Sequence, residues 1–486
     1  MKAAVSALAA ALLAAGCASP GPVAPPRAPL AIGSSPGWPD LARDGTAWSA
    51  WRDPVLDGLV AGALERQPSL QVVRLRVQQA QAAADIAGAA RGPQVNAGVD
   101  LTDQRFTENG LYPRPLAGSW KWNNSAQVGA GWEWDLFGRQ QAAVAAAIGQ
   151  QRAAAAEAQA ATLLLSANLA SAYVTLARTL EQRRIAEAAL AEREQVLTIV
   201  RQRVGAGLDN TVDLRQAEGT VAQTRVELAA ADEQIARARH ALAELSGQRP
   251  DALDTLAPAL APLRAQALPA GLPADLVGRR ADVVAQRWRV EAATQDVAVA
   301  RAQFYPNLNL VAFAGLASLG LDRFVEAGSR QFGVGPAIRL PIFDGGRLRA
   351  NLGAKAAEAD IAVETYNATL LRALREVADE VTGLKAIEAQ QREQDAALAA
   401  AEAAFDLATQ RYRAGLGNFL VVLTAEGSVL AQRRSAADLK ARHLLAEVAL
   451  SRALGGGLQA EPPTHALGGG LQVEAPSTTL AESPFR

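Results

Sequence analysis

The chain contains the stretch "GAGLDNTVDLRQAEG" at residues 205–219 and a second version of it, "RAGLGNFLVVLTAEG", at residues 413–427. Aligned 208 positions apart, residues 202–219 and 410–427 are identical at nine of eighteen positions. The shared residues of the first copy are Gln202, Arg203, Ala206, Gly207, Leu208, Asn210, Ala217, Glu218 and Gly219. A match this far along the chain predicts a duplicated half-protein, because a solenoid unit would recur at a much shorter period.

The duplication continues on both sides of these segments. Arg139 and Gly247 are matched by Arg347 and Gly455 at the same spacing, and further upstream the spacing becomes 213. The matched residues there are Arg76, Val77, Pro93 and Asn96 with Arg289, Val290, Pro306 and Asn309. We therefore expect two repeats, over 45–248 and 249–457, each with a helix, two strands and a long helical hairpin.

A long helical stretch without proline precedes each version of the shared stretch. Residues 140–204 and 347–414 are rich in Ala, Gln, Glu, Arg and Leu, which favour helix. At 1.5 Å per residue each helix would be about 100 Å long. Glycines in the turn that follows can supply left-handed caps, and residues 211–246 and 419–454 then form returning helices. The shared stretch is thus the tip of a long antiparallel hairpin, which occurs twice in the chain.

One part of the first helical stretch could also cross a membrane. Residues 158–177 are uncharged and long enough to span a bilayer. The repeat counterpart, residues 366–385, carries several charges. They include Arg372, Arg375, Glu376, Asp379 and Glu380. Because duplicated elements should share an environment, we expect no spanning helix.

Strand patterns precede each long helix. Residues 94–102, 126–135 and 331–342 alternate between apolar side chains on one face and polar residues or glycine on the other, and residues 307–316 alternate less regularly. Such stretches of about ten residues are typical of outer-membrane barrel strands, although a half-buried soluble sheet alternates in the same way. Trp132 and Trp134 end one apolar face, as interface aromatics do, and glycines on the other face would leave a lumen.

Four strands are too few to close a barrel, since bacterial barrels start at about eight. An open strand edge in lipid leaves backbone groups without hydrogen bonds, at a cost of several kcal/mol each. The strands therefore predict assembly with further copies of the chain.

The N-terminus, "MKAAVSALAAALLAAGCASP", has the layout of a secretory signal peptide over residues 1–16. Cys17 is the one cysteine of the chain, and "AAGC" resembles a bacterial lipobox, in which that cysteine is diacylated. The alternative is an ordinary signal peptide with an incidental cysteine. Ala18, rather than aspartate, follows Cys17, and the lipoprotein resemblance then favours the outer membrane.

Two low-complexity segments flank the repeats. Residues 17–44 are rich in Pro, Gly, Ser and Ala, which is typical of an extended tether. Residues 458–486 contain part of a doubled "ALGGGLQ" together with several prolines, and we expect a disordered tail there.

Composition excludes several classes of function. The 48 basic and 49 acidic residues balance, so no basic face for nucleic acid is expected. The three histidines, His240, His443 and His465, have no repeat partners, which disfavours a metal site. No set of nucleophile, base and acid and no phosphate-binding loop is present, so we expect neither an enzyme nor a cofactor.

Six phrases in order resemble one family. They are "WRDPVLDGLVAGALERQPSL" (51–70), "WEWDLFGR" (132–139), "PADLVGRRADV" (273–283), "ARAQFYPNLNL" (300–310), "PIFDGGRLRANL" (341–352) and "RYRAGLGNFL" (411–420). The sequence resembles the TolC/OprM-type outer-membrane efflux factors, in their lipoprotein branch. The resemblance implies an α+β membrane protein that is a homotrimer. Its twelve-stranded barrel, four strands per chain, would be continued by a helical periplasmic tunnel.

The resemblance also implies a function and partners. The protein would be a passive exit duct in the outer membrane of a Gram-negative bacterium, docked to a periplasmic adaptor and an inner-membrane pump. A type I secretion duct and a structural coiled-coil envelope lipoprotein are the alternatives. The docking tips would contain Gly205, Gly207, Leu208, Gly415 and Leu416.

Family members narrow the mouth with a tyrosine on the second tip bonded to an aspartate on the first. The matching residues are Tyr412 and Asp213. The family's arginine and inward aspartates of the second tip are replaced here. Gly417, Val421 and Thr424 occupy those positions. The ring of acidic groups is therefore absent from the second tip, and Asp209 and Asp213 of the first tip are the candidate gate residues that could replace it.

Overall fold

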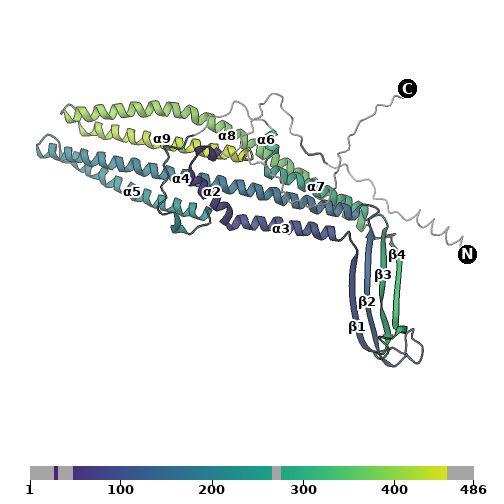
Figure 1. Ribbon diagram of the computed structural model, residues 1–486. Coiled ribbons are helices and arrows are strands. Elements are labelled where there is room, and N and C mark those ends of the chain that lie inside the picture. The colour runs from purple at the N-terminus through teal and green to yellow at the C-terminus, as the bar shows by residue number, and fades with distance from the viewer. Residues whose placement is uncertain (1–26, 31–46, 265–274, 457–486) are drawn as a thin grey trace, which may run out of the picture.

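The computed structural model describes residues 27–30, 47–264 and 275–456, which form a long helical body with a narrow sheet projecting from one end (Figure 1). The first half contains η1 (Ala47–Trp51), α2 (Pro54–Arg66), α3 (Pro68–Ala89), β1 (Gln94–Arg105), β2 (Trp120–Trp134), α4 (Arg139–Gly205) and α5 (Thr211–Leu245). The second half contains η2 (Pro250–Leu253), α6 (Asp275–Gly278), α7 (Ala281–Ala302), β3 (Asn307–Leu319), η3 (Ala327–Ser329), β4 (Arg330–Arg339), α8 (Arg347–Arg413) and α9 (Phe419–Ala453). The internal duplication is therefore visible in the order of the elements.

The long helices α4 and α8 have 67 residues each and begin in the same way. Gly138 and Gly346 precede them with φ values of 72° and 91°, a backbone conformation that glycine adopts without strain. An aspartate then accepts a backbone N–H of the first turn: Asp135 from Gln141 at 2.8 Å, and Asp344 from Leu348 at 2.7 Å. A carboxylate at a helix start satisfies N–H groups that have no partner within the helix.

The four strands form one antiparallel sheet in the order β1-β2-β3-β4, so β2 and β3 join the two halves. The register keeps each kind of residue on one face. Val128 pairs with Ala97 and with Ala314, whereas Gln127 pairs with Gly98 and with Gly315. From Val128 to Trp134 one face is thus apolar across the sheet, and the strands at its two edges, β1 and β4, each have one open side within this chain.

The strand ends and the less regular third strand differ from the sequence pattern for local reasons. β2 starts at Trp120, before the alternation begins, and β4 stops at Arg339, which pairs with Asn307, the first residue of β3. Phe313 of β3 lies on the glycine face. A Cβ at Gly333 would come within 2.7 Å of the Phe313 ring, so glycine makes room for this aromatic side chain.

The apolar face of β2 carries tryptophans at both ends. Trp120 and Trp122 lie at one end and Trp132 and Trp134 at the other, all on the same side by the strand alternation. The ten residues from Trp122 to Trp132 span about 33 Å along the strand, or about 25 Å of height once the strand is tilted by about 40°. That height is the one expected between two aromatic girdles, and within it Asn124 and Ser318 form a polar pair next to Trp122.

The helices of the body pack around α4, which contributes many small buried residues. Within the described residues, α4 is the one helix long and apolar enough by composition to cross a bilayer, and 56% of its apolar window is buried. It packs along α3, α5, α7 and α9, so packing between helices accounts for its hydropathy. The largest core cluster gathers α4 with η1 and α2, and there the Tyr173 hydroxyl donates to Asp53 at 2.7 Å.

Candidate functional site: the hairpin tips

The two tips form the end of the helical body that lies farthest from the sheet (Figure 1). Each helix stops in a Schellman turn, in which glycine occupies the left-handed position: Gly207 has φ 74° and Gly415 has φ 76°. The following leucines close the turns, because Leu208 N–H donates to Arg203 O at 2.9 Å and Leu416 N–H donates to Arg411 O at 2.8 Å. Both leucine side chains are exposed.

The returning helices begin with matched caps. Asn210 accepts the N–H of Asp213 at 3.0 Å, and Asn418 accepts the N–H of Val421 at 3.1 Å. At the first tip Asp213 also accepts the N–H of Asn210 at 3.5 Å, which completes a capping box. The side chain of Asp213 is therefore engaged in holding the start of α5.

Three side chains connect the two tips, and we call Arg203, Asp209 and Tyr412 the tip cluster. The Tyr412 hydroxyl donates to Asp209 Oδ2 at 2.6 Å. Arg203 donates to both carboxylate oxygens of Asp209, at 2.8 and 3.1 Å, and its guanidinium lies 4.7 Å from the centre of the Tyr412 ring. The cluster thus combines a bidentate ion pair, a charge-assisted hydrogen bond and a cation–π contact.

The surroundings stabilise the charge state of the tip cluster. Hydrogen bonding from Arg203 holds the pKa of Asp209 below its ordinary value of 3.8. Burial, together with the bond to Asp209, raises the pKa of Tyr412 above its ordinary value of 10.0. Tyr412 is only 1% exposed and packs with Phe419, so little water competes for its hydroxyl. At neutral pH the phenol is a donor and the carboxylate an acceptor.

The outer membrane efflux protein family matches residues 59–248 and 272–456 of this sequence, which include both hairpins, all four strands and the whole tip cluster. The chain belongs to that family. The predicted family is therefore confirmed, and so are the predicted fold class of a barrel-forming, internally duplicated outer-membrane channel and the predicted role as an efflux channel.

Named relatives agree with this assignment. The fusaric acid resistance protein FusA of Burkholderia cepacia is 37% identical over 369 residues, covering 72% of this chain and 68% of FusA. The multidrug resistance outer membrane protein MdtP of Escherichia coli is 33% identical over 437 residues, covering 88% of this chain and 89% of MdtP. The crystal structure of the outer membrane protein VceC from Vibrio cholerae has a TM-score of 0.79 at 36% identity, covering 85% of this chain and 99% of VceC.

The predicted hydrogen bond between Tyr412 and Asp213 is wrong for this member of the family. Tyr412 donates to Asp209, which was predicted as an acidic gate residue but not as the partner of the tyrosine, because Asp213 closes the capping box of α5. Asp209 lies in the turn itself, where the Schellman geometry directs its carboxylate toward Arg203 and the second tip. Of the predicted tip glycines, Gly205 is still within α4, whereas Gly207 and Gly415 make the turns.

The replaced family positions of the second tip add no charge. Gly417 lies in the turn, and Val421 is exposed on the first turn of α9. Thr424 donates its hydroxyl to the carbonyl of Leu420 within the helix at 2.8 Å. The second tip therefore offers an apolar surface where the resemblance led us to look for acids.

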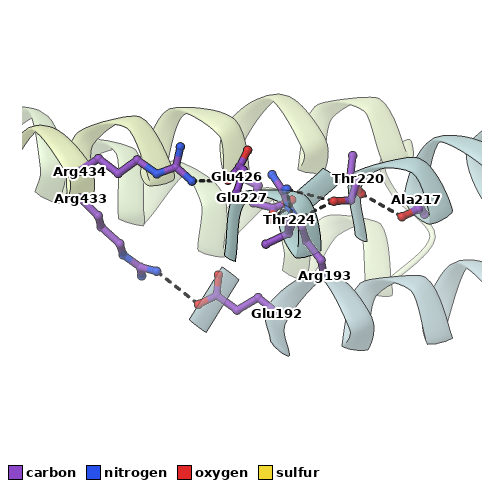
Figure 2. A network of polar contacts seen from close by, with 9 residues as sticks. All are labelled: Glu192, Arg193, Ala217, Thr220, Thr224, Glu227, Glu426, Arg433 and Arg434. Atoms are coloured by element: carbon purple, nitrogen blue, oxygen red, sulfur yellow. Dashed lines mark hydrogen bonds and ion pairs between the residues drawn. The ribbon is translucent and has the colours of Figure 1, made fainter. Parts of the chain in front are cut away.

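A second polar network lies along the hairpins, on the sheet side of the tips, and joins α4 and α5 to α9 (Figure 2). At its centre, Arg193 of α4 donates to Glu426 of α9 at 2.7 Å and to Thr224 of α5 at 2.5 Å. Arg433 and Arg434 of α9 add contacts to α4 and α5; their acidic partners there are Glu192 and Glu227. The Arg193–Glu426 pair is nearly buried, with side-chain exposures of 13% and 5%.

Sequence reasoning missed Arg203, Arg193 and Glu426. Arg203 is matched by Arg411 in the other repeat, and Glu426 is matched by Glu218. A charge repeated on an apolar helix was therefore the signal that could have identified these two residues. Arg193 is matched by Ala401 and carried no such signal. The predicted lipidation site Cys17, the signal peptide and the C-terminal tail lie outside the described residues.

Proposed function

We propose that three copies of this chain form the passive exit duct of a tripartite efflux system, and that the tip cluster closes its periplasmic mouth. The open edges of β1 and β4 support the trimer, because three four-stranded sheets supply the twelve strands of one closed barrel. The apolar face that crosses the sheet from Val128 to Trp134 favours a membrane duct over a soluble coiled-coil scaffold.

The observation that carries the gate is the Tyr412–Asp209 hydrogen bond. It links the second tip to the first at the end of the helical body opposite the sheet, where the mouth of a tunnel would lie. A hydrogen bond to a charged group contributes about 1.5–3 kcal/mol, and three symmetric copies would act together. Opening the mouth would separate the tips and break these bonds.

The apolar tips fit a docking role. Leu208 and Leu416 project from the two Schellman turns, and Leu420 and Val421 extend the exposed surface of the second tip. In many Schellman turns the corresponding side chain packs back on its own helix. Here the side chains face outward, as hairpin contacts with a periplasmic adaptor would require. The adaptor would in turn connect the duct to an inner-membrane pump.

Conductance of purified protein in planar bilayers tests the gate. Tyr412→Phe keeps the ring but removes the donor, and we expect it to raise the closed-state conductance several-fold. Tyr366→Phe is the matched control, since Tyr366 is buried on α8 far from the tips and its change should leave conductance at the parental level. Equal conductance of Tyr412→Phe and the parent would rule out this gate.

A further inference from the structure

The glycine-rich face of the sheet, which the proposed duct turns toward its lumen, carries few charges. By strand alternation they are Asp100 of β1, Lys121 and Glu133 of β2, and Arg339 of β4. Lys121 lies at the end of the sheet farthest from the helices, and Glu133 and Arg339 lie at the end next to them. Asp100 is therefore the one charge in the middle of this face.

Asp100 is exposed and keeps its charge available. Its carboxylate accepts a hydrogen bond from the hydroxyl of Ser125 at 3.4 Å, and within the part of the chain that the structure describes it makes no ion pair. Glu133, in contrast, accepts two hydrogen bonds from Arg139, at 2.7 and 3.0 Å. The charge of Glu133 is thus neutralised inside the chain, whereas that of Asp100 can attract a cation in the lumen.

Phe313 of β3 is the one aromatic residue on the same face of the four strands. It pairs with Gly129 on one side and with Gly333 on the other. A Cβ at Gly333 would come within 2.7 Å of the ring, so the ring lies over this glycine. Because neither paired residue has a side chain, the exposed part of the ring faces the lumen.

The duplication places Asp100 and Phe313 at equivalent positions. Phe313 comes 213 residues after Asp100, which is the spacing between the first strands of the two repeats, and Gly333 comes 208 residues after Ser125. The strand registers agree, because Asp100 pairs with Ser125 and Phe313 pairs with Gly333. In a barrel of three copies, equivalent positions lie at one height. Three carboxylates then alternate with three aromatic rings around the lumen, and we call this set of Asp100 and Phe313 side chains the lumen ring.

We infer that the lumen ring binds organic cations that carry an aromatic group as they leave through the duct. Carboxylates attract the positive charge, and the face of an aromatic ring attracts it as well. Neighbouring members of the ring are two strands apart, about 10 Å measured across the strands, which a planar cation of several fused rings can bridge. The inference rests on the trimeric duct of the proposed function and adds the class of cargo that the barrel favours.

Binding of ethidium, a planar fluorescent cation, to full-length trimers purified in detergent tests the lumen ring. Asp100→Asn keeps the size of the side chain and removes its charge, so the Kd should rise about fivefold to tenfold. Phe313→Leu keeps an apolar side chain and removes the ring, and the Kd should rise about threefold, as for a solvent-exposed cation–π contact. The effect of Asp100→Asn should shrink as salt is added, because salt screens the carboxylates.

Asp103→Asn and Phe332→Leu are the matched controls. Asp103 is on the same strand as Asp100, and Phe332 is next to Gly333, but both are on the lipid face of the sheet. They make the same chemical changes outside the lumen, so the Kd for ethidium should stay at the parental value.

Competition with small ions tests the parent trimer without any substitution. Benzyltrimethylammonium and benzenesulfonate have the same aromatic ring and opposite charges, and the first should displace ethidium whereas the second should not. Tetramethylammonium lacks the ring and should displace less ethidium than benzyltrimethylammonium at the same concentration. Equal displacement by the aromatic cation and the aromatic anion would overturn the lumen ring.

Native electrophoresis of each sample separates the lumen ring from the duct. Parental trimers that do not bind ethidium would overturn the lumen ring and leave the proposed duct standing. The same conclusion would follow from trimers in which Asp100→Asn weakens binding no more than Asp103→Asn does. Monomers of the parent would overturn both the ring and the duct.

Discussion

The pKa directions of Asp209 and Tyr412 predict that the charges of the tip cluster do not change around neutral pH. The pKa of the Asp209 carboxyl lies below 3.8 because Arg203 donates to the ionised form, and the pKa of Tyr412 lies above 10.0 because of burial. A lowered carboxyl pKa contributes stability that is present above the ordinary value and is lost as pH falls through the folded value. We expect closed-state conductance to be flat between about pH 5 and about pH 9 and to rise only below about pH 4. Bilayer recordings across this range check it, and a step near neutral pH would contradict it.

The two neighbouring aspartates of the first tip should respond differently to substitution. Asp209→Asn removes the charge that binds Arg203 and weakens the acceptor for Tyr412, so conductance should rise as it does for Tyr412→Phe. Asp213→Ser removes a contact confined to the cap of α5, and it should lower the thermal stability slightly without raising conductance. Loss of a single cap costs about 1 kcal/mol. A larger rise in conductance for Asp213→Ser than for Asp209→Asn would show that Asp213, not Asp209, is the gate residue.

The partner of Tyr412 could not be chosen from the sequence, although the tip itself could. Asp209 and Asp213 lie four residues apart, and both are within reach of a tyrosine on a facing tip. The choice depends on the capping box that engages Asp213 and on the turn that aims Asp209 at Arg203, and both are properties of backbone geometry. The repeated glycines and asparagines, in contrast, fixed the position of the turns.

The ends of the helices were predictable to within about one or two residues because strong local signals mark them, whereas strand ends were not. α5 begins at Thr211, directly after Asn210, and α9 begins at Phe419, directly after Asn418, as predicted. The first six residues of β2, "WKWNNS", carry no clean alternation, so the pattern began only at Ala126. Their strand conformation comes from the ladder with β1, which pairs Trp120 with Arg105.

The sheet predicts opposite effects of one substitution on its two faces. Val128 lies between the tryptophan pairs of β2 on the apolar face, and its neighbour Gln127 lies on the glycine-rich face. Arginine near the middle of a bilayer costs about 2–4 kcal/mol on a lipid-facing position. Val128→Arg should therefore reduce the yield of heat-modifiable trimer in outer membranes far more than Gln127→Arg. Similar yields for both variants would contradict the assignment of the faces.

The Arg193–Glu426 pair predicts that the two hairpins of one chain resist separation well above the tips. Removing one member of a buried ion pair leaves an unpaired charge and costs about 3–5 kcal/mol. Arg193→Met should therefore increase amide hydrogen exchange in α4 and α9 around this pair. Arg193→Met combined with Glu426→Leu should restore much of the protection. Arg201→Met is the control, because the pair of Arg201 with Glu218 is exposed and long at 3.5 Å, and such pairs contribute at most about 1 kcal/mol.

At the scale of the whole molecule, the duplication explains both what one chain completes and what it leaves open. α4 packs extensively against α7 within the chain, whereas the described residues show no contact of that extent between their repeat mates α8 and α3. In the sheet, β2 pairs with β3 inside the chain, and β1 and β4 each have one open edge within it. The four strand patterns predicted an assembly of several copies because four strands cannot close a barrel, but the exposed apolar side chains of the helices, such as Ile361, became evident only from burial.

Residues 27–30 form a strap against α8, in which Arg27 makes an ion pair with Glu364, and this strap bears on the predicted lipid anchor at Cys17. It runs along α8 away from the sheet, since Arg27 lies at Asp360 and Leu30 at Asn367. Asp360 is thirteen residues beyond Arg347 at the start of α8, which places it about 20 Å below the sheet end. The ten residues from Cys17 to Arg27 can span at most about 35 Å. An acylated Cys17 is thus within reach of the inner leaflet of the membrane around the barrel.

We therefore expect the mature chain to begin at Cys17 with acyl chains attached, which mass spectrometry of the purified N-terminus can establish. One acyl chain alone gives only marginal membrane affinity, far below that of a spanning barrel. Replacement of residues 1–17 by an ordinary cleavable signal peptide should for that reason leave trimers in the outer membrane, with conductance like that of the parent. Arg27→Ala in this unlipidated form should then release the strap, seen as faster proteolysis near residue 27, while Arg114→Ala in the loop between β1 and β2 should not. An unmodified N-terminus at another residue would refute the lipid anchor, and equal proteolysis of both variants would refute the strap.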